Sequence, residues 1–149
     1  DVPPKRPGIY CLLNNSYNIY SYDYCQKFLN DIVNSIPEKY YLQTEIILKL
    51  KKDYNNIDPN YRVLVERIVR NKKIRLITDI SPESIIEVSD ATISIPFTST
   101  AVTSYNKNKE TIYYDPSGKL TKNNCLEKNI TLISSQKNLK FWILNILNK

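Results

Sequence analysis

The sequence predicts an α/β fold, namely a three-layer Rossmann-like domain with a mostly parallel sheet. Short apolar segments alternate along the chain with amphipathic stretches, and this alternation is typical of β-α-β units with right-handed crossovers. The length of 149 residues is that of one domain and is enough to bury a core. We therefore expect residues 1–149 to form a single Rossmann-like domain.

The first predicted elements follow a proline-rich segment at the start of the sequence, which ends at Pro7. Residues 9–13 are apolar, which fits either a short strand or a packed loop. Over residues 22–36 apolar side chains recur every three or four positions, so we expect a helix, which Pro37 ends. The apolar run in residues 45–51 predicts a strand whose carboxyl end carries lysines.

Helix caps and further apolar periodicity predict the helices and strands after residue 57. Asp58 and Ser81 are each followed by proline, and a capping residue before proline at the first helical position marks the start of a helix. The predicted helices are 58–70, 81–88, 98–105 and 134–147, and the predicted strands are 74–78, 91–95, 111–114 and 130–133. In such a sheet ligands bind beyond the carboxyl ends of the strands, so we expect functional residues there.

The composition excludes several kinds of catalytic site. The chain has no histidine, which rules out Ser-His-Asp and Cys-His catalysis and the HExxH zinc site. With two glycines it also lacks a glycine-dense phosphate loop. The three cysteines, Cys11, Cys25 and Cys125, have no metal-binding spacing. We therefore expect no metal and no cofactor, and we expect Cys25 to be a buried thiol on a helix.

The charge leaves two interpretations open. A net charge of +6 and a pI of about 9.1 fit a nucleic-acid partner. A lysine excess also arises from A/T-rich codon usage, which the abundance of Asn, Ile and Tyr indicates, and no run of lysines exceeds two. We favour the second interpretation and expect no nucleic-acid partner.

The expected location is the cytoplasm. An odd number of cysteines argues against a disulfide framework. No stretch approaches 18 consecutive apolar residues, so we expect no membrane span. The first residue is Asp1, which suggests a fragment or a processed chain.

Three consecutive hydroxyl residues, Thr98, Ser99 and Thr100, follow the predicted strand 91–95 after a turn at Pro96. They stand where the next helix should begin, and the N–H groups of a helix N-terminus together with hydroxyls can bind phosphate oxygens. One of the three would also serve as an ordinary N-cap. The residues alone leave both a phosphate-binding role and a capping role open.

Charged residues stand at the other strand ends. Lys49 and Lys51 alternate with leucines, so on a strand both would reach the same crevice and suit a diphosphate. Solvated lysines leaving an edge strand would show the same pattern. Asp79 could accept a hydrogen bond from a ribose hydroxyl, or form a turn or cap with Ser81. Asp115 precedes Pro-Ser-Gly, which is typical of a type I turn.

Two segments that contain these residues resemble a known family. Residues 90–101, with Pro-Phe-Thr-Ser at 96–99, and residues 112–118 are similar to bacterial surface-polysaccharide biosynthesis proteins named for a Pro-Phe-Thr-Ser motif. The similarity covers most of the chain and is most specific over residues 90–118. The resemblance implies the C-terminal half of a B-type glycosyltransferase, in which two Rossmann-like domains face a cleft and the C-terminal one holds the nucleotide-sugar donor.

The resemblance also implies roles for individual residues. Those that would contact the donor phosphates are Lys49, Lys51, Thr98, Ser99 and Thr100. Asp115 would contact the sugar or order its loop. The catalytic base would lie on the missing N-terminal domain, and the acceptor would be a glycan. The location would be the cytoplasm or the cytoplasmic face of the inner membrane, with peripheral membrane association. The alternative is a non-catalytic α/β ligand-binding or regulatory module.

Overall fold

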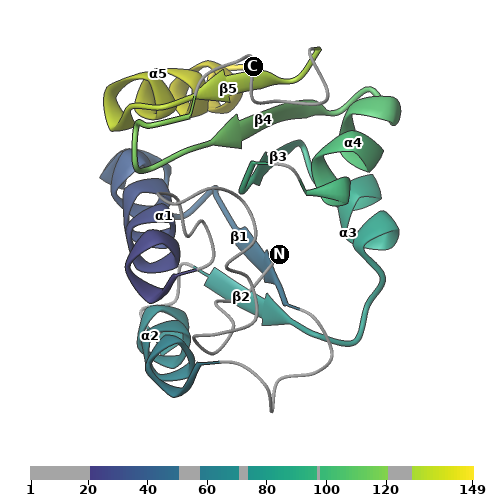
Figure 1. The fold of residues 1–149 in the computed structure, drawn as a ribbon. Coiled ribbons are helices and arrows are strands. Elements are labelled where there is room, and N and C mark those ends of the chain that lie inside the picture. The colour runs from purple at the N-terminus through teal and green to yellow at the C-terminus, as the bar shows by residue number, and fades with distance from the viewer. Residues whose placement is uncertain (1–20, 51–57, 71–73, 97, 121–128) are drawn as a thin grey trace.

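Two small parallel sheets form the middle layer of the fold (Figure 1). The computed structural model describes residues 21–50, 58–70, 74–96, 98–120 and 129–149. One sheet pairs β1 (Ile46–Lys49) with β2 (Ile74–Ile77). The other joins β3 (Ala91–Ser94), β4 (Glu110–Tyr114) and β5 (Thr131–Ile133) in that order. All of these pairings are parallel, as the sequence predicts.

Helices cover both faces of the sheets (Figure 1). Helix α1 (Tyr22–Ser35) contacts α2 (Pro59–Arg70) and α5 (Gln136–Leu147), and these three helices form one layer. Helices α3 (Pro82–Val88) and α4 (Ser99–Asn106) contact each other and form the other layer. The structure therefore confirms the Rossmann-like α/β class, with two parallel sheets where one was expected.

Four of the described helices begin at residues whose side chains cap the first turn, and two of these caps, Asp58 and Ser81, are predicted from the sequence. The side chains that accept an N–H bond from the first turn of their helix are Ser21, Ser81 and Ser135. Asp58 starts α2 in the same way, because its Oδ1 atom accepts a hydrogen bond from the Asn60 N–H at 2.8 Å. The short 3₁₀ helix η1 (Glu38–Tyr40) is not predicted from the sequence. Residues 9–13 and Lys51 lie outside the described residues.

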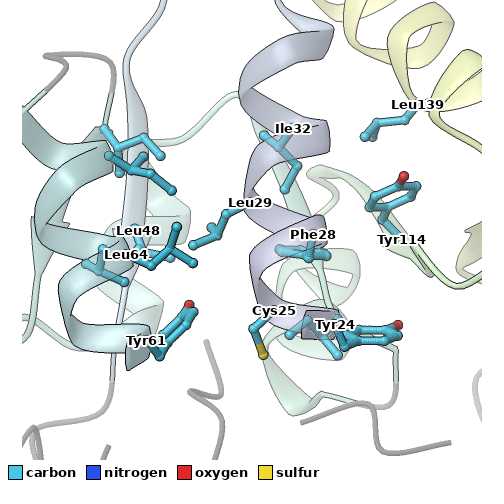
Figure 2. Packing of buried hydrophobic residues seen from close by; sticks show 14 of the residues in the cluster. Tyr24, Cys25, Phe28, Leu29, Ile32, Leu48, Tyr61, Leu64, Tyr114 and Leu139 are labelled. Atoms are coloured by element: carbon cyan, nitrogen blue, oxygen red, sulfur yellow. The ribbon is translucent and has the colours of Figure 1, made fainter. Parts of the chain in front are cut away.

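Helix α1 covers the boundary between the two sheets and contributes core residues toward both (Figure 2). Phe28 packs against Tyr114 of β4, with ring centroids 5.9 Å apart. Leu29, on the neighbouring face of the helix, points toward Leu48 of β1 and Leu64 of α2. All five side chains belong to one hydrophobic cluster. Each fully buried side chain of this kind contributes about 1.5–3 kcal/mol, so α1 ties the two sheets into one core.

Cys25 lies on the buried face of the same helix, as predicted. Its side chain is 1% exposed, and burial raises the pKa of the thiol to about 12. The thiol therefore stays protonated at neutral pH and acts as a small apolar core residue.

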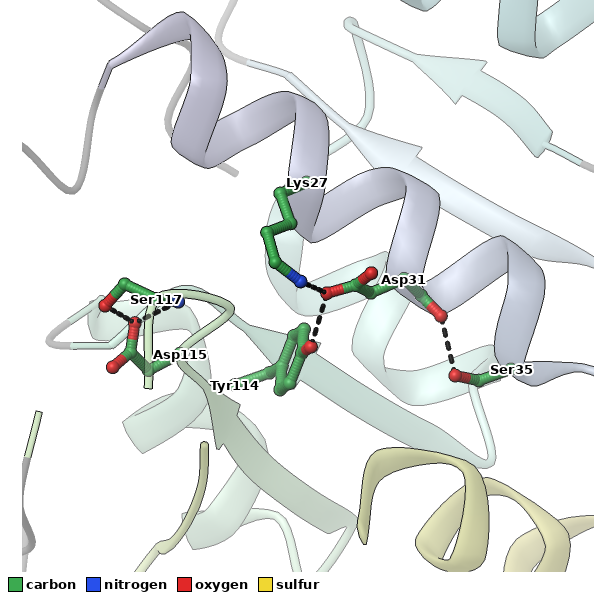
Figure 3. Close-up of polar contacts among 6 residues, drawn as sticks. All are labelled: Lys27, Asp31, Ser35, Tyr114, Asp115 and Ser117. Carbon is green, nitrogen blue, oxygen red and sulfur yellow. Dashed lines mark hydrogen bonds and ion pairs between the residues drawn. The ribbon is translucent and has the colours of Figure 1, made fainter. Parts of the chain in front are cut away.

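A buried carboxylate on α1 fixes the helix against β4 (Figure 3). Asp31 is 7% exposed, and its Oδ2 atom accepts a hydrogen bond from the Tyr114 hydroxyl at 2.6 Å. The same oxygen forms an ion pair with the Lys27 Nζ atom, also at 2.6 Å. Because a buried charge without partners costs several kcal/mol, both donors are needed to keep Asp31 in the core.

Replacing Tyr114 with Phe should lower the free energy of unfolding by about 1–3 kcal/mol, because the buried Asp31 carboxylate loses a hydrogen-bond donor while the ring packing remains. Urea unfolding at neutral pH measures the change. Tyr105→Phe is the matched control, since Tyr105 is 42% exposed and the substitution should change stability by less than about 0.5 kcal/mol. Equal stability of Tyr114→Phe and Tyr105→Phe would show that the Asp31 contact contributes nothing.

The free energy of unfolding should also fall in alkaline solution, in part because the Tyr114 hydroxyl ionises more readily in the unfolded chain. Burial, followed by the hydrogen bond to Asp31, raises the pKa of the Tyr114 hydroxyl above its ordinary value. A group whose pKa is higher in the folded state stabilises the fold below its unfolded pKa, here about 10, and loses this contribution as pH rises further. Unfolding measured from about pH 9 to pH 11 should show a smaller loss for Tyr114→Phe than for the parent chain.

Candidate functional site

An open pocket of about 420 Å³ lies between the carboxyl ends of β1 and β2 and the start of α4, the helix that follows β3. One wall comes from the ends of β1 and β2 and the start of α3, and the other comes from the first turns of α4. The lining residues are Lys49, Thr78, Asp79, Ile80, Ser81, Pro82, Glu83, Ser99, Thr100 and Thr103. The pocket thus lies where ligands bind in parallel α/β sheets, and it joins four of the residues predicted from the sequence.

The three hydroxyl residues at the start of α4 divide into two roles. Thr98 is the N-cap residue and is 5% exposed. Its hydroxyl points back into the protein and donates a hydrogen bond to the Ile95 carbonyl at 3.1 Å. Ser99 and Thr100, in the first turn, line the pocket. Two hydroxyl residues and the N-terminal end of α4 therefore line the cavity, an arrangement that attracts anions.

Lys49 stands in the opposite wall of the pocket and has a structural role as well. Its Nζ atom donates a hydrogen bond to the Thr78 carbonyl at 2.9 Å and another to the Leu50 carbonyl. These contacts join the carboxyl ends of β1 and β2. They also hold the ammonium group at the pocket wall, where it can face an anionic ligand without further ordering of the side chain.

The same wall carries two carboxylates. Asp79 is exposed and accepts a hydrogen bond from the Thr78 hydroxyl at 3.0 Å. Glu83 lies in the first turn of α3, two residues after the N-cap Ser81, and was not predicted from the sequence. The sequence signal for Glu83 is its position two residues after Ser81, the helix cap that follows β2. Among the described residues that line the pocket, one ammonium therefore stands with two carboxylates.

Asp115, at the end of β4, is fully buried and is not one of the described pocket residues (Figure 3). Its Oδ1 atom accepts hydrogen bonds from the N–H and hydroxyl of Ser117, at 3.0 and 2.6 Å. Its Oδ2 atom accepts from the N–H groups of Lys119 and Leu120, at 2.9 and 2.8 Å. Burial opposes ionisation, but these hydrogen bonds outweigh it and hold the pKa of Asp115 below its ordinary value. In this structure the carboxylate orders the loop after β4.

Two further properties bear on function. No group of three or more His, Cys, Asp and Glu side chains in the described part of the chain could hold a metal ion. Within the same residues, every helix is too short or too polar to cross a membrane. The described lining of the pocket offers hydroxyls, carboxylates, one ammonium group and backbone N–H groups.

The chain matches a known protein family. The model of the family described as "Polysaccharide biosynthesis PFTS motif protein" matches residues 1–143, which is nearly the whole chain. No curated protein and no solved structure is significantly similar to the chain. The matched range includes Pro96, Thr98 and Ser99 of the motif, together with every described residue that lines the pocket.

Replacing Asp115 with Asn should destabilise the fold by about 2–3 kcal/mol, because each oxygen of Asp115 accepts two hydrogen bonds and an amide NH₂ would face two donors. Thermal unfolding at pH 7 measures the change, and Asp79→Asn at the exposed pocket wall is the control. A group with a lowered pKa stabilises the fold above its unfolded pKa and loses that contribution as pH falls, so Asp115→Asn should also flatten the acid side of the stability profile. Equal melting temperatures for the two variants would contradict the buried role.

Proposed function

Because the chain belongs to the family of polysaccharide biosynthesis PFTS motif proteins, we propose that it is the nucleotide-sugar donor-binding domain of a glycosyltransferase. The observation that carries the proposal is the pocket between the carboxyl ends of β1 and β2 and the start of α4, which is lined by the motif residue Ser99 and by Lys49. A ligand that lies in this pocket contacts residues on either side of it, from the β1–β2 sheet and from α4. The size of the pocket and its lining of both polar and apolar residues suit a small phosphorylated molecule.

The two walls of the pocket suit the two ends of such a donor. At the start of α4, the hydroxyls of Ser99 and Thr100 and the N-terminal end of the helix offer donors to phosphate oxygens. Asp79 and Glu83 offer acceptors to the hydroxyls of a ribose or sugar. Lys49 lies on the acidic side and can neutralise a phosphate that reaches between the walls.

The chemical role of these residues in the proposal is to stabilise the leaving group. Transfer of a glycosyl unit leaves negative charge on the nucleotide phosphate, and donors held in place before the reaction stabilise that charge without reorganisation. Lys49 is held by two backbone carbonyls, and the α4 N–H groups are held by the helix itself. The acceptor glycan and the catalytic base are assigned to a second domain, so residues 1–149 alone should bind a donor without transferring its sugar.

Isolated residues 1–149 should bind one class among CMP-, UDP- and GDP-sugars, with amide chemical-shift changes concentrated at Ser99 and Thr100. Ser99→Ala and Thr100→Val should each weaken binding roughly tenfold, because each removes a hydrogen bond to a charged phosphate, worth about 1.4 kcal/mol or somewhat more. NMR titration and isothermal calorimetry measure the two effects. Lys140→Met, which removes an exposed charge on α5 in the other helix layer, should leave the affinity unchanged.

The outcomes separate the two candidate functions. Shifts that map to the start of α4 and disappear in Ser99→Ala support the donor site. The absence of a response to every nucleotide sugar would favour a non-catalytic ligand-binding or regulatory module. Turnover of a nucleotide sugar by residues 1–149 without another domain would contradict the proposed division of labour.

A further inference from the structure

A second cavity, of about 360 Å³, lies at the amino ends of β1 and β3, opposite the strand ends that form the pocket described above. Its described lining also includes the end of α1, the end of α3 and the second half of α5. Val88 of α3 lines this amino-end cavity and is 74% exposed, so the cavity opens to solvent beside it. The described linings of the two sites share no residue.

The charged groups in the described lining of the amino-end cavity are two carboxylates, those of Glu45 and Asp90. The Glu45 Oε1 atom lies 3.2 Å from the Arg75 Nε atom, but both side chains are more than half exposed, and such a surface ion pair is weak. Asp90 has no ion-pair partner among the described residues. The cavity is therefore locally acidic, although the chain carries a net charge of +6.

Two helices end at the amino-end cavity and make its potential more negative. These are α1, whose C-cap residue Ile36 lines the cavity, and α5, whose last turn does so. The carboxyl end of a helix carries a partial negative charge, which a basic residue in the last turn commonly offsets. Neither helix has one, whereas α2, which is not part of the described lining, has Arg67 and Arg70 there. Lys149, just beyond α5, pairs with Glu110.

Two further side chains of the amino-end cavity suit a cationic ligand. Trp142 of α5 is half-buried in the lining, and tryptophan is the side chain that attracts cations best through its ring. The Thr44 Oγ1 atom is buried and has no hydrogen-bond partner among the described residues. Because buried polar atoms are nearly always paired, this hydroxyl indicates a polar atom of a ligand. Most of the other described lining is aliphatic.

We propose that the amino-end cavity binds a small aliphatic amine in its protonated form. The ammonium group pairs with Asp90 and contacts the ring of Trp142, and the Thr44 hydroxyl can accept one of its hydrogen bonds. The alkyl chain lies against the aliphatic lining. An anion of the same shape would be repelled by both carboxylates. This proposal rests on the residues of the amino-end cavity and is independent of the proposed function.

Trp142 is the only tryptophan in the sequence, so its fluorescence reports on the amino-end cavity. Titration of the full 149-residue chain with hexylammonium at neutral pH should change the tryptophan emission saturably. The neutral isostere 1-hexanol should bind about tenfold more weakly or worse, and hexanoate should not bind. Asp90→Asn should weaken hexylammonium binding about tenfold, because it removes the charge that faces the ammonium group. Glu66→Gln, which removes an exposed carboxylate of α2 outside the described lining, is the matched control and should leave the affinity unchanged.

Three results would overturn the proposal. Equal affinities for 1-hexanol and hexylammonium would show that the cavity recognises the alkyl chain alone. Equal weakening by Asp90→Asn and Glu66→Gln would show that the ammonium ion responds to the charge of the whole chain. Tryptophan emission that changes with protein concentration but not with hexylammonium would assign the cavity to a second copy of the chain. Asp90 is exposed, so its substitution should leave the fold intact and the comparison interpretable.

Discussion

The contact between Asp31 and Tyr114 is the constraint on which the arrangement of the two sheets depends. A carboxylate that is almost fully buried has to keep its hydrogen-bond donors, and one of these donors is at the end of β4. This requirement fixes the register of α1 against the three-stranded sheet. On its other face α1 packs through Leu29 toward β1 and α2. The helix therefore sets the position of one sheet relative to the other.

The shape of the pocket depends on the position of the two sheets relative to one another. Its basic and acidic residues lie at the end of β1 and after β2, whereas Ser99, Thr100 and Thr103 lie on α4, which follows β3 of the other sheet. A shift of α1 would change the separation between Lys49 and Ser99 without altering either wall. Residues that are remote from the pocket, Asp31 and Tyr114 above all, thus help to determine whether a ligand can reach both walls.

The sequence predicted the elements and the region of the site because both depend on local pattern. Apolar periodicity located α1, the caps at Asp58 and Ser81 located α2 and α3, and the strand-end rule located Lys49 and Ser99. What the pattern could not predict was the partner of each side chain. Thr98 turns inward to Ile95, and Lys49 bonds a carbonyl 29 residues away in the chain. Such choices depend on tertiary neighbours, which a single sequence does not specify.

The charges at the pocket narrow the kind of ligand that can occupy it. Although the chain carries a net charge of +6, the described pocket lining has Lys49 against Asp79 and Glu83, so the positive excess is not concentrated there. A nucleic-acid strand carries a phosphate at every nucleotide, and these phosphates would be repelled by the carboxylates of Asp79 and Glu83. A molecule with phosphate at one end and hydroxyls at the other meets donors at α4 and acceptors at Asp79 and Glu83. The proposal of a nucleotide-sugar donor therefore rests on the distribution of charge within the site and not on the total charge of the chain.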